Sequence, residues 1–331
     1  MTTNTDTNQP ITFSPPLWLR NPHIQSIVSS TLPRKLLVKR KAKTMLTNTQ
    51  QEIIQCNDGI RLLGEYSHND ANEKLLIMLH GWEGCIESNY MLSVAAHMYS
   101  QGYSIFRLNL RDHGNSSHLN QRPYNSARLA EILDAMEEIQ RRHPHHDNYL
   151  VGFSLGGNFS LRIAANAHQR ECNFNKIIAV CPVISPGHTM QSLATGLPLY
   201  HNHFVSLWKN SLLNKLEHFP ELDYEENLKP LSTLQAMNEY FIPHLTDYDT
   251  LPAYFDAYSV GGNYLQDLSS PVHIITSADD PVVLCEDLNL ISTQSASLTI
   301  EITQYGGHCA FIENVKLASW IDRRISQLLQ N

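Results

Sequence analysis

Short, almost unbroken apolar runs recur along the chain, and loops or helical patterns separate them. The runs are "KLLIMLH" (74–80), "YSIFRLNL" (103–110), "NYLVGFS" (148–154), "KIIAVCP" (176–182), "PVHIITS" (271–277) and "SLTIEIT" (297–303). Continuous apolar runs of this length are typical of strands that are buried on both faces. The pattern therefore predicts a sheet with both of its faces covered.

Helical periodicity fills several of the gaps between these runs. One face of a helix between the second and third runs is marked by Leu129, Ile132, Leu133, Met136 and Ile139. A closing helix after the last run is marked by Val315, Leu317, Trp320, Ile321, Ile325 and Leu328. Ser126 is the candidate N-cap of the first of these helices. Alternation of strands and helices predicts the α/β class, with a mostly parallel central sheet and helices on both faces.

Two segments depart from this rhythm. Residues 51–67 predict a β-hairpin around Asn57-Asp58-Gly59, where a positive φ is tolerated. Residues 185–265 contain amphipathic, aromatic-rich pieces and predict an inserted helical cap, because so long a structureless loop is uncommon in a compact domain. The predicted organisation is a flexible N-terminus (1–16), a first core part with an N-terminal arm (17–184), the cap (185–265) and a second core part (266–331).

Composition narrows the class of protein further. The chain has 331 residues, of which 42% are hydrophobic, and this is enough for a sizeable core. A net charge of -8 argues against a general nucleic-acid binder. No apolar run approaches the length of a membrane span, and the N-terminus has no signal-peptide pattern. Six cysteines without a CxxC pair are typical of reduced thiols, so we expect a cytoplasmic protein.

Three sequence features bear on whether the chain binds nucleic acid, a metal ion or a nucleotide cofactor. The basic run "PRKLLVKRKAK" (33–43) is interpreted as a solvated face, with contact to phosphates or a membrane surface as the alternative. "HPHH" (143–146) is interpreted as a loop, because Pro144 breaks helical ligand pairing and no partner has clear metal-site spacing. Nucleotide-binding glycine motifs do not occur in the sequence. We therefore expect no cofactor, no metal and no nucleic-acid partner.

Ser154 is the candidate nucleophile. Gly152-Phe153-Ser154-Leu155-Gly156 lies between a strand-like run and a helix-capable segment, which is the setting of a nucleophile elbow. Glycines two residues before and after the serine avoid crowding at a strained turn. A helix that starts directly after the serine also points N–H groups at developing negative charge.

A serine nucleophile needs a base and an acid that orients the base. In this architecture the chain order is serine, then acid, then histidine. His308 follows the last apolar run in a glycine-containing loop and is the predicted base. Asp280 is favoured as the acid because of its place after the run 271–277, and Asp279 is the alternative.

Two backbone amides are expected to form an oxyanion hole. One belongs to Leu155, the residue after the nucleophile, and the other belongs to Trp82 in the loop "LHGWEGCIESNY" (79–90). In that loop His80-Gly81 allows the backbone to approach a substrate closely.

Five motifs together resemble a known family. They are "NPHIQS" (21–26), "LHGWEG" (79–84), "GFSLGGN" (152–158), "SADDP" (277–281) and "YGGHCAFIE" (305–313). From about residue 17 to the C-terminus, the chain resembles the α/β-hydrolase fold and, more narrowly, the YheT-like hydrolases. The resemblance implies a Ser-Asp-His esterase or lipase-type enzyme, related to ABHD-type phospholipases and to fungal ester-forming acyltransferases. "NPHIQS" is a marker of this family for which chemistry alone suggests no role.

The chain also departs from its relatives. "LRDHGNSS" (110–117) replaces an Arg-Gly-Cys-type turn, and His113 is interpreted as a histidine that packs the loop. Some relatives carry His-x4-Asp in connection with acyl transfer, whereas here Glu313 follows His308.

Three functions are compatible with the sequence. The first is hydrolysis of a small-molecule ester, with an apolar acyl group expected from the aromatic and aliphatic cap. The others are acyl transfer from the same acyl-enzyme and binding of a lipid or partner without turnover. Membrane contact is expected to be peripheral at most, and the sequence does not define the oligomeric state.

Overall fold

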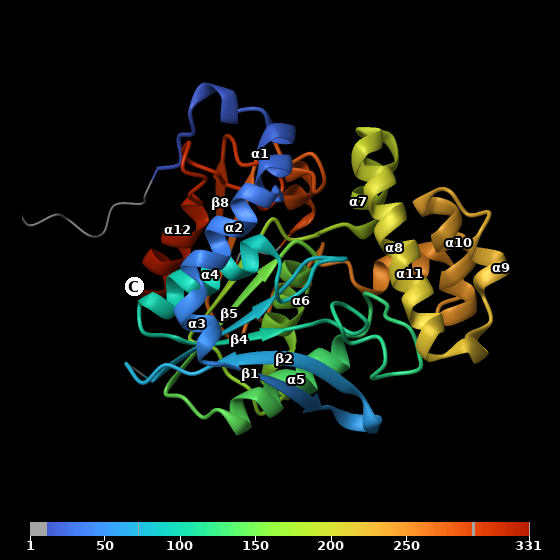
Figure 1. Ribbon diagram of the computed structural model, residues 1–331, viewed down its shortest axis with the longest axis horizontal. Helices are drawn as coiled ribbons and strands as arrows, with labels where there is room; N and C mark the ends of the chain where they lie inside the picture. Colours follow the sequence, from blue (N-terminus) through green and yellow to red (C-terminus); the bar gives the residue numbers. More distant parts are fainter. Residues whose placement is uncertain (1–11, 72, 293–294, 331) are drawn as a thin grey trace, which may run out of the picture.

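A single large sheet forms the centre of the computed structural model, which describes residues 12–71, 73–292 and 295–330. Its eight strands have the order β1-β2-β4-β3-β5-β6-β7-β8 (Figure 1). The pairs β1–β2 and β2–β4 are antiparallel, and all later neighbours are parallel. The strands are β1 (Thr49–Gln55), β2 (Arg61–Ser67), β3 (Lys74–Leu79), β4 (Ser104–Leu108), β5 (Asp147–Phe153), β6 (Lys176–Val180), β7 (Val272–Ser277) and β8 (Leu298–Thr303).

The two edges of the sheet test two of the predictions. The predicted hairpin is confirmed as β1 and β2, and its turn η2 (Asn57–Gly59) has positive φ at Asp58 (54°) and Gly59 (71°). The prediction that 297–303 is buried on both faces is wrong. Ile300 and Ile302 of β8 are 40% and 52% exposed, because β8 is an edge strand that helices do not cover on both sides.

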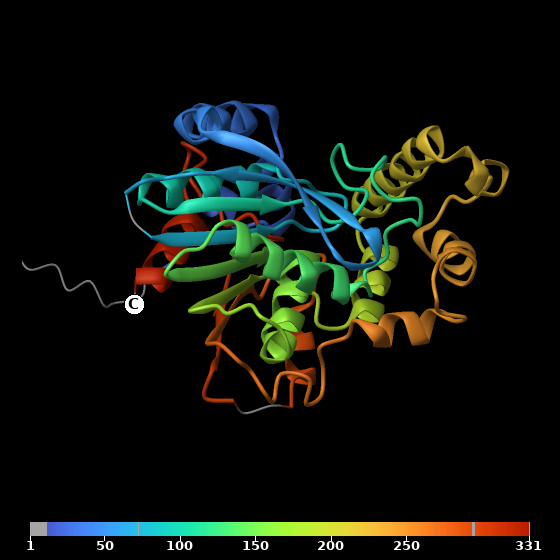
Figure 2. The same ribbon diagram turned by 90° about the horizontal axis from the view of Figure 1, so that it is seen from below.

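Helices cover both faces of the sheet (Figure 2). Alternate residues of β3 point to opposite sides, with Leu75 and Ile77 in one core and Leu76 and Met78 in the other. The first core includes residues of α5 (Leu129–Arg142) and α6 (Leu155–Asn166). The second core includes residues of α2 (Leu32–Lys41), α4 (Asn89–Ser100) and α12 (Trp320–Gln330).

The predicted apolar faces of the helices are largely confirmed, but two of their starting points are wrong. Ser126 does not cap α5, which starts at Leu129 after Arg128. The Ser126 N–H instead donates to Tyr254 Oη at 2.8 Å, because this turn packs against a distant helix. The closing helix begins only at Trp320, since Val315 is 74% exposed and Leu317 has a left-handed φ of 55°.

Between β6 and β7 the chain forms a group of helices beside the sheet, drawn in yellow and orange in Figure 1. They are α7 (Pro186–Thr195), α8 (Pro198–His218), η4 (Pro220–Leu222), α9 (Glu225–Leu228), α10 (Leu234–Leu245) and α11 (Leu251–Ala257). Lys215 of α8 is buried, and its Nζ donates to Asp112 Oδ1 at 2.8 Å and to Ser117 O at 3.0 Å. A buried cation with these partners fixes α8 to the loop after β4.

The N-terminal arm consists of short helices along one side of the sheet. They are η1 (Leu17–Leu19), α1 (Pro22–Ser29), α2 and α3 (Lys43–Thr47). Of the predicted flexible N-terminus, residues 1–11 lie outside the described residues, whereas Phe13 packs on Trp320 with ring centroids 5.4 Å apart. Among the described residues, no helix is both long and apolar enough to cross a membrane.

Candidate active site

Ser154 lies at the sharp turn between β5 and α6. Its backbone has φ 54° and ψ -114°, a conformation that is strained for a residue with a side chain. The Ser154 N–H donates to Val180 O at 2.8 Å, which ties the turn to the neighbouring strand β6. The surrounding hydrogen bonds therefore hold a conformation that an isolated peptide would avoid.

The glycines around Ser154 are sterically required. A Cβ at Gly152 would lie 2.1 Å from Gly156 O, and a Cβ at Gly156 would lie 2.4 Å from Leu79 O. At Gly157 the nearest atoms, in Pro182, would be 3.1 Å from a Cβ, which is tight but less severe. Helix α6 can thus pack directly against β3 and β5 only because Gly152 and Gly156 have no side chains.

His308 connects Ser154 to Asp280. Its Nε2 is 2.9 Å from Ser154 Oγ, and its Nδ1 is 2.8 Å from Asp280 Oδ2. The Asp280 side chain is fully buried, and its Oδ1 accepts from the amides of Val282 and Val283 at 2.9 and 3.0 Å. With Nδ1–H donating to the carboxylate, Nε2 is left to accept the proton of the serine hydroxyl.

The neighbouring Asp279 has a different environment. Its Oδ1 accepts from the Gly307 N–H at 2.9 Å, and burial raises the pKa of its carboxyl group. Asp279 therefore braces the loop that carries His308, while Asp280 is the aspartate that the structure brings to the imidazole.

The electrostatic environment of His308 favours its protonated form. Burial of the ring lowers the pKa of His308, but negative charge on the Asp280 carboxylate and on the Cys309 sulfur outweighs this effect. The pKa of His308 therefore lies well above the ordinary histidine value. An imidazolium at this position is stabilised, as a base that takes up the serine proton requires.

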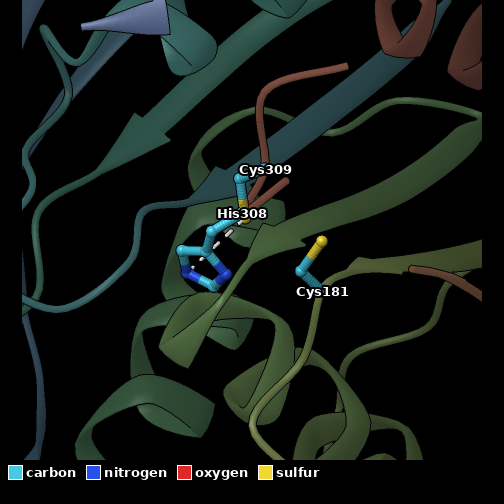
Figure 3. A group of neighbouring side chains, drawn as sticks. All are labelled: Cys181, His308 and Cys309. Atoms are coloured by element: carbon cyan, nitrogen blue, oxygen red, sulfur yellow. Dashed lines mark hydrogen bonds between the residues drawn. The ribbon is translucent and has the colours of Figure 1, made fainter. Parts of the chain in front are cut away.

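Two thiols lie beside His308, and sequence reasoning did not identify them as its neighbours (Figure 3). Cys309 Sγ is 4.0 Å from His308 Nε2, and one donor atom each from Cys181, His308 and Cys309 lie within 4.8 Å of one another. An imidazole nitrogen and two sulfurs are ligands suited to a soft metal ion such as Zn²⁺. A metal ion bound to Nε2 would compete with the Ser154 hydroxyl for the same nitrogen.

The loop after β3 passes directly beside the serine. A Cβ at Gly81 would lie 3.1 Å from the Cβ of Ser154, a tight contact that glycine avoids. The Gly81 N–H donates to Tyr90 Oη at 2.9 Å, which fixes the position of the loop. The next residue is Trp82, whose amide is a candidate oxyanion-hole donor together with that of Leu155 at the start of α6.

The buried His80 stabilises this loop by hydrogen bonds. Burial lowers the pKa of His80 to about 3, so the ring is neutral. Its Nδ1–H donates to Gly81 O at 2.8 Å, and its Nε2 accepts from the Leu110 N–H at 3.0 Å. A neutral histidine thus connects the Gly81 turn to the loop after β4.

The other histidines that the sequence singled out have separate partners. His113 Nδ1 is 2.7 Å from Arg111 O, and its ring packs edge-on against Tyr124. In the 143–146 segment, His143 pairs with Glu52 at 3.0 Å and His146 pairs with Asp147 at 2.9 Å. The side chains of that segment therefore do not converge on a common point.

The "NPHIQS" segment holds the loop that carries His308, a role that the sequence did not reveal. Gln25 is fully buried; its Nε2 donates to Leu19 O and Ile312 O, and its Oε1 accepts from the Ile312 N–H at 2.8 Å. Ser26 Oγ accepts from the His308 N–H at 3.0 Å. The signals in the sequence were the family motif itself and the polar pair Gln25-Ser26 between two isoleucines, and neither identifies a distant partner.

Ser154 and His308 open into a cavity of about 390 Å³. Helices α7, α8 and α10 supply most of its apolar wall, together with Trp82 and Val282. The apolar side chains of that wall include Trp82, Met190, Leu193, Phe204, Leu207, Trp208, Leu212, Phe241, Ile242, Leu245 and Val282. Trp82 stacks on Phe204 at a ring-centroid distance of 5.2 Å and meets Trp208 edge-on at 5.6 Å.

The sequence profile described as "alpha/beta hydrolase fold" matches residues 74–315. The chain belongs to the α/β-hydrolase fold family. This α/β-hydrolase is 23% identical to YheT of Escherichia coli (strain K12), over 99% of its own length and 96% of that of YheT. It is 21% identical to the monoacylglycerol lipase of Saccharomyces cerevisiae (strain ATCC 204508 / S288c), over 80% of its own length and 60% of that protein. The predicted resemblance to YheT-like hydrolases is confirmed.

Solved structures show the same fold for this α/β-hydrolase. The Pyrococcus furiosus esterase Pf2001 superposes with a TM-score of 0.58 at 15% identity, covering 87% of this chain and 92% of Pf2001. The esterase EaEST from Exiguobacterium antarcticum has a TM-score of 0.53 at 16% identity, covering 85% of this chain and 100% of EaEST. The predicted fold class is thereby confirmed.

Proposed function

We propose that this α/β-hydrolase cleaves carboxylic esters with Ser154 as nucleophile, His308 as base and Asp280 as the acid that orients the base. The observation that carries the proposal is the continuous hydrogen-bonded chain from Asp280 through His308 to Ser154 at an open cavity. Ser154 Oγ attacks the acyl carbonyl while His308 Nε2 takes the serine proton, and the imidazolium then protonates the departing alcohol. Water, deprotonated by His308, hydrolyses the acyl-enzyme.

The negative charge of the tetrahedral intermediate needs donors close to Ser154. The Leu155 amide lies at the start of α6, where the helix dipole also favours an anion. The Trp82 amide follows Gly81, whose backbone passes against Ser154. In our proposal these two N–H groups form the oxyanion hole.

The proposed substrate is a small-molecule ester with an apolar acyl group. The wall of the cavity is largely aliphatic and aromatic, so it favours a hydrocarbon chain over a charged group. The similarity to a monoacylglycerol lipase supports a lipid-like ester as substrate.

Hydrolysis is favoured over acyl transfer by the environment of Glu313. This residue follows His308 in the region where some relatives place an aspartate, but its carboxylate pairs with Arg323 Nη2 at 2.5 Å. The Glu313 carboxylate is therefore already engaged with a cation. Added alcohol would test the alternative, because acyl transfer would convert it into an ester product.

A fluorophosphonate probe tests the proposed nucleophile. We expect the wild-type protein to be labelled and Ser154→Ala to remain unlabelled, because the probe reacts with an activated serine. Ser30→Ala is the matched control, since Ser30 lines the same cavity, whereas the hydroxyl that lies 2.9 Å from His308 Nε2 belongs to Ser154. Labelling that persists in Ser154→Ala, or a folded wild-type protein that neither reacts nor hydrolyses esters, would exclude the proposal.

A further inference from the structure

The N-terminal arm concentrates exposed apolar side chains. Seven of the fifteen large apolar side chains that are exposed among the described residues lie between Leu17 and Leu37. Leu17 is 79% exposed, Leu32 67% and Leu36 62%. Scattered single apolar residues are ordinary on a protein surface, whereas these seven lie on the three successive elements η1, α1 and α2. We call this cluster the arm face; it consists of Leu17, Trp18, Ile24, Ile27, Leu32, Leu36 and Leu37.

Positive charge accompanies these side chains. The chain has a net charge of -8, yet no acidic residue occurs between Thr12 and Gln51. The exposed cations within and directly after the arm face are Lys35, Lys39, Arg40, Lys41 and Lys43. Of these, Lys39 also lies 3.8 Å from the Glu87 carboxylate. On α2, Leu32, Leu36, Lys39 and Arg40 have the spacing i, i+4, i+7, i+8, so they lie on the same side of the helix. The two cations lie about one turn beyond Leu36.

The arm face is also next to the candidate active site. Ser26, Ser29 and Ser30 of α1 and its C-terminal end line the same cavity as Ser154. His23 of α1 lies 3.1 Å from Tyr200 Oη of α8, and α8 begins beside two further exposed apolar residues, Leu197 and Leu199. One wall of the cavity is therefore continuous with elements that expose apolar side chains.

We propose that the arm face docks the enzyme on an anionic lipid surface. A membrane interface accepts aliphatic side chains and a tryptophan while its headgroups attract lysine and arginine, and the arm offers both groups together. Charge complementarity selects an anionic lipid surface over a second copy of this chain, because two identical basic segments would repel each other. The inference rests on the proposed function only in that docking would bring the cavity close to lipid esters.

Vesicle co-sedimentation tests the docking directly. The full chain should bind vesicles of equimolar phosphatidylcholine and phosphatidylglycerol, bind pure phosphatidylcholine weakly, and lose binding as salt is added. Lys39→Gln/Arg40→Gln should weaken binding roughly 30-fold, because each surface cation contributes about 1 kcal/mol. Leu32→Ser/Leu36→Ser should also weaken it, while both double variants keep wild-type hydrolysis of a short soluble ester.

Matched variants elsewhere on the surface distinguish a membrane-docking site from nonspecific adsorption to vesicles. Ile300→Ser/Ile302→Ser removes two exposed apolar residues from β8, and Arg141→Gln/Lys229→Gln removes two exposed cations. Both should bind vesicles as the wild type does. Equal weakening in these controls, no binding of the wild type at low salt, or a dimer that Leu32→Ser/Leu36→Ser dissociates would overturn the proposal. Ser154→Ala should still bind vesicles, so failure of the catalytic proposal is recognised separately.

Discussion

Two adjacent aspartates illustrate how a single step along the chain changes a side chain's role. Asp280 Oδ1 accepts hydrogen bonds from two backbone N–H groups of its own turn, and these bonds hold Oδ2 next to His308 Nδ1. Asp279 points to Gly307 on the opposite side of the loop. Both residues follow β7, and the sequence favoured Asp280 with Asp279 as the alternative. The choice between them depends on the backbone direction of one turn, which residue type does not encode.

Replacing each aspartate separately should show this difference in role. Asp280→Asn is expected to lower kcat by about 10⁴-fold, because an amide no longer holds the tautomer that leaves Nε2 free. Asp279→Asn keeps an oxygen that can accept from Gly307 and should lower kcat far less. Steady-state kinetics with a chromogenic ester measures both effects, and thermal unfolding verifies that both variants fold. Equal losses in the two variants would contradict the assignment.

The pH profile should report the raised pKa of His308. A protonated imidazole cannot take the serine proton, so kcat/KM should rise with pH through the pKa of His308. Because the Asp280 carboxylate raises this pKa, the acid limb should lie above the ordinary histidine value of about 6.5. In Asp280→Asn the residual activity should have its acid limb at lower pH. An unshifted limb in that variant would show that another group controls the profile.

At the scale of elements, the site depends on packing between segments that are distant in the chain. Helix α1 reaches the loop of His308 through Gln25 and Ser26, and α6 reaches β3 through Gly156. With these contacts in place, His308 Nε2 lies 2.9 Å from Ser154 Oγ. Both contacts can therefore be tested by changes that leave Ser154, His308 and Asp280 in place.

Gln25→Ala should lower kcat more than it raises KM. The change leaves the buried amide and carbonyl of Ile312 without their side-chain partner, which costs about 1–3 kcal/mol of stability and loosens the loop that positions His308. The cavity wall is untouched, so substrate binding should change little. Gln235→Ala on α10 is the control, since Gln235 is exposed. Lower stability with an unchanged kcat would mean that Gln25 has a structural role alone.

Gly156→Ala should disrupt the elbow, whereas Gly187→Ala should not. At Gly156 a Cβ would meet backbone atoms at 2.4 Å, so α6 must shift away from β3, at a cost of about 1–3 kcal/mol or more. At Gly187, in α7, the nearest atom to a Cβ is a Phe255 carbon at 3.7 Å, an ordinary contact. Denaturant unfolding and fluorophosphonate labelling measure the two effects. Normal labelling of a fully stable Gly156→Ala protein would show that the close packing is unnecessary.

For the whole molecule, the sequence predicted those strands and helices whose formation depends on residues close together in the chain. Buried strands require continuous apolar runs, and the helix face of α5 follows from its periodicity, so both could be recognised. The exposure of Ile300, the partner of Ser126 and the late start of α12 depend on neighbours remote in sequence. The same holds in the candidate site, where motif order pointed to Ser154 and His308 but not to the supporting Gln25. Tertiary packing decides these features, and a single sequence carries little signal for them.

The shape of the cavity leads to a prediction about the substrate. Trp208 contributes its ring to the apolar wall and contacts Trp82. Trp208→Ala should lower kcat/KM for p-nitrophenyl octanoate about tenfold relative to the acetate, because each buried methylene contributes about 0.8 kcal/mol and about two lose their contact. Trp18→Ala is the matched control, since Trp18 is 45% exposed on the arm face and does not line the cavity. If both esters lost activity equally in Trp208→Ala, the acyl chain would have to bind elsewhere.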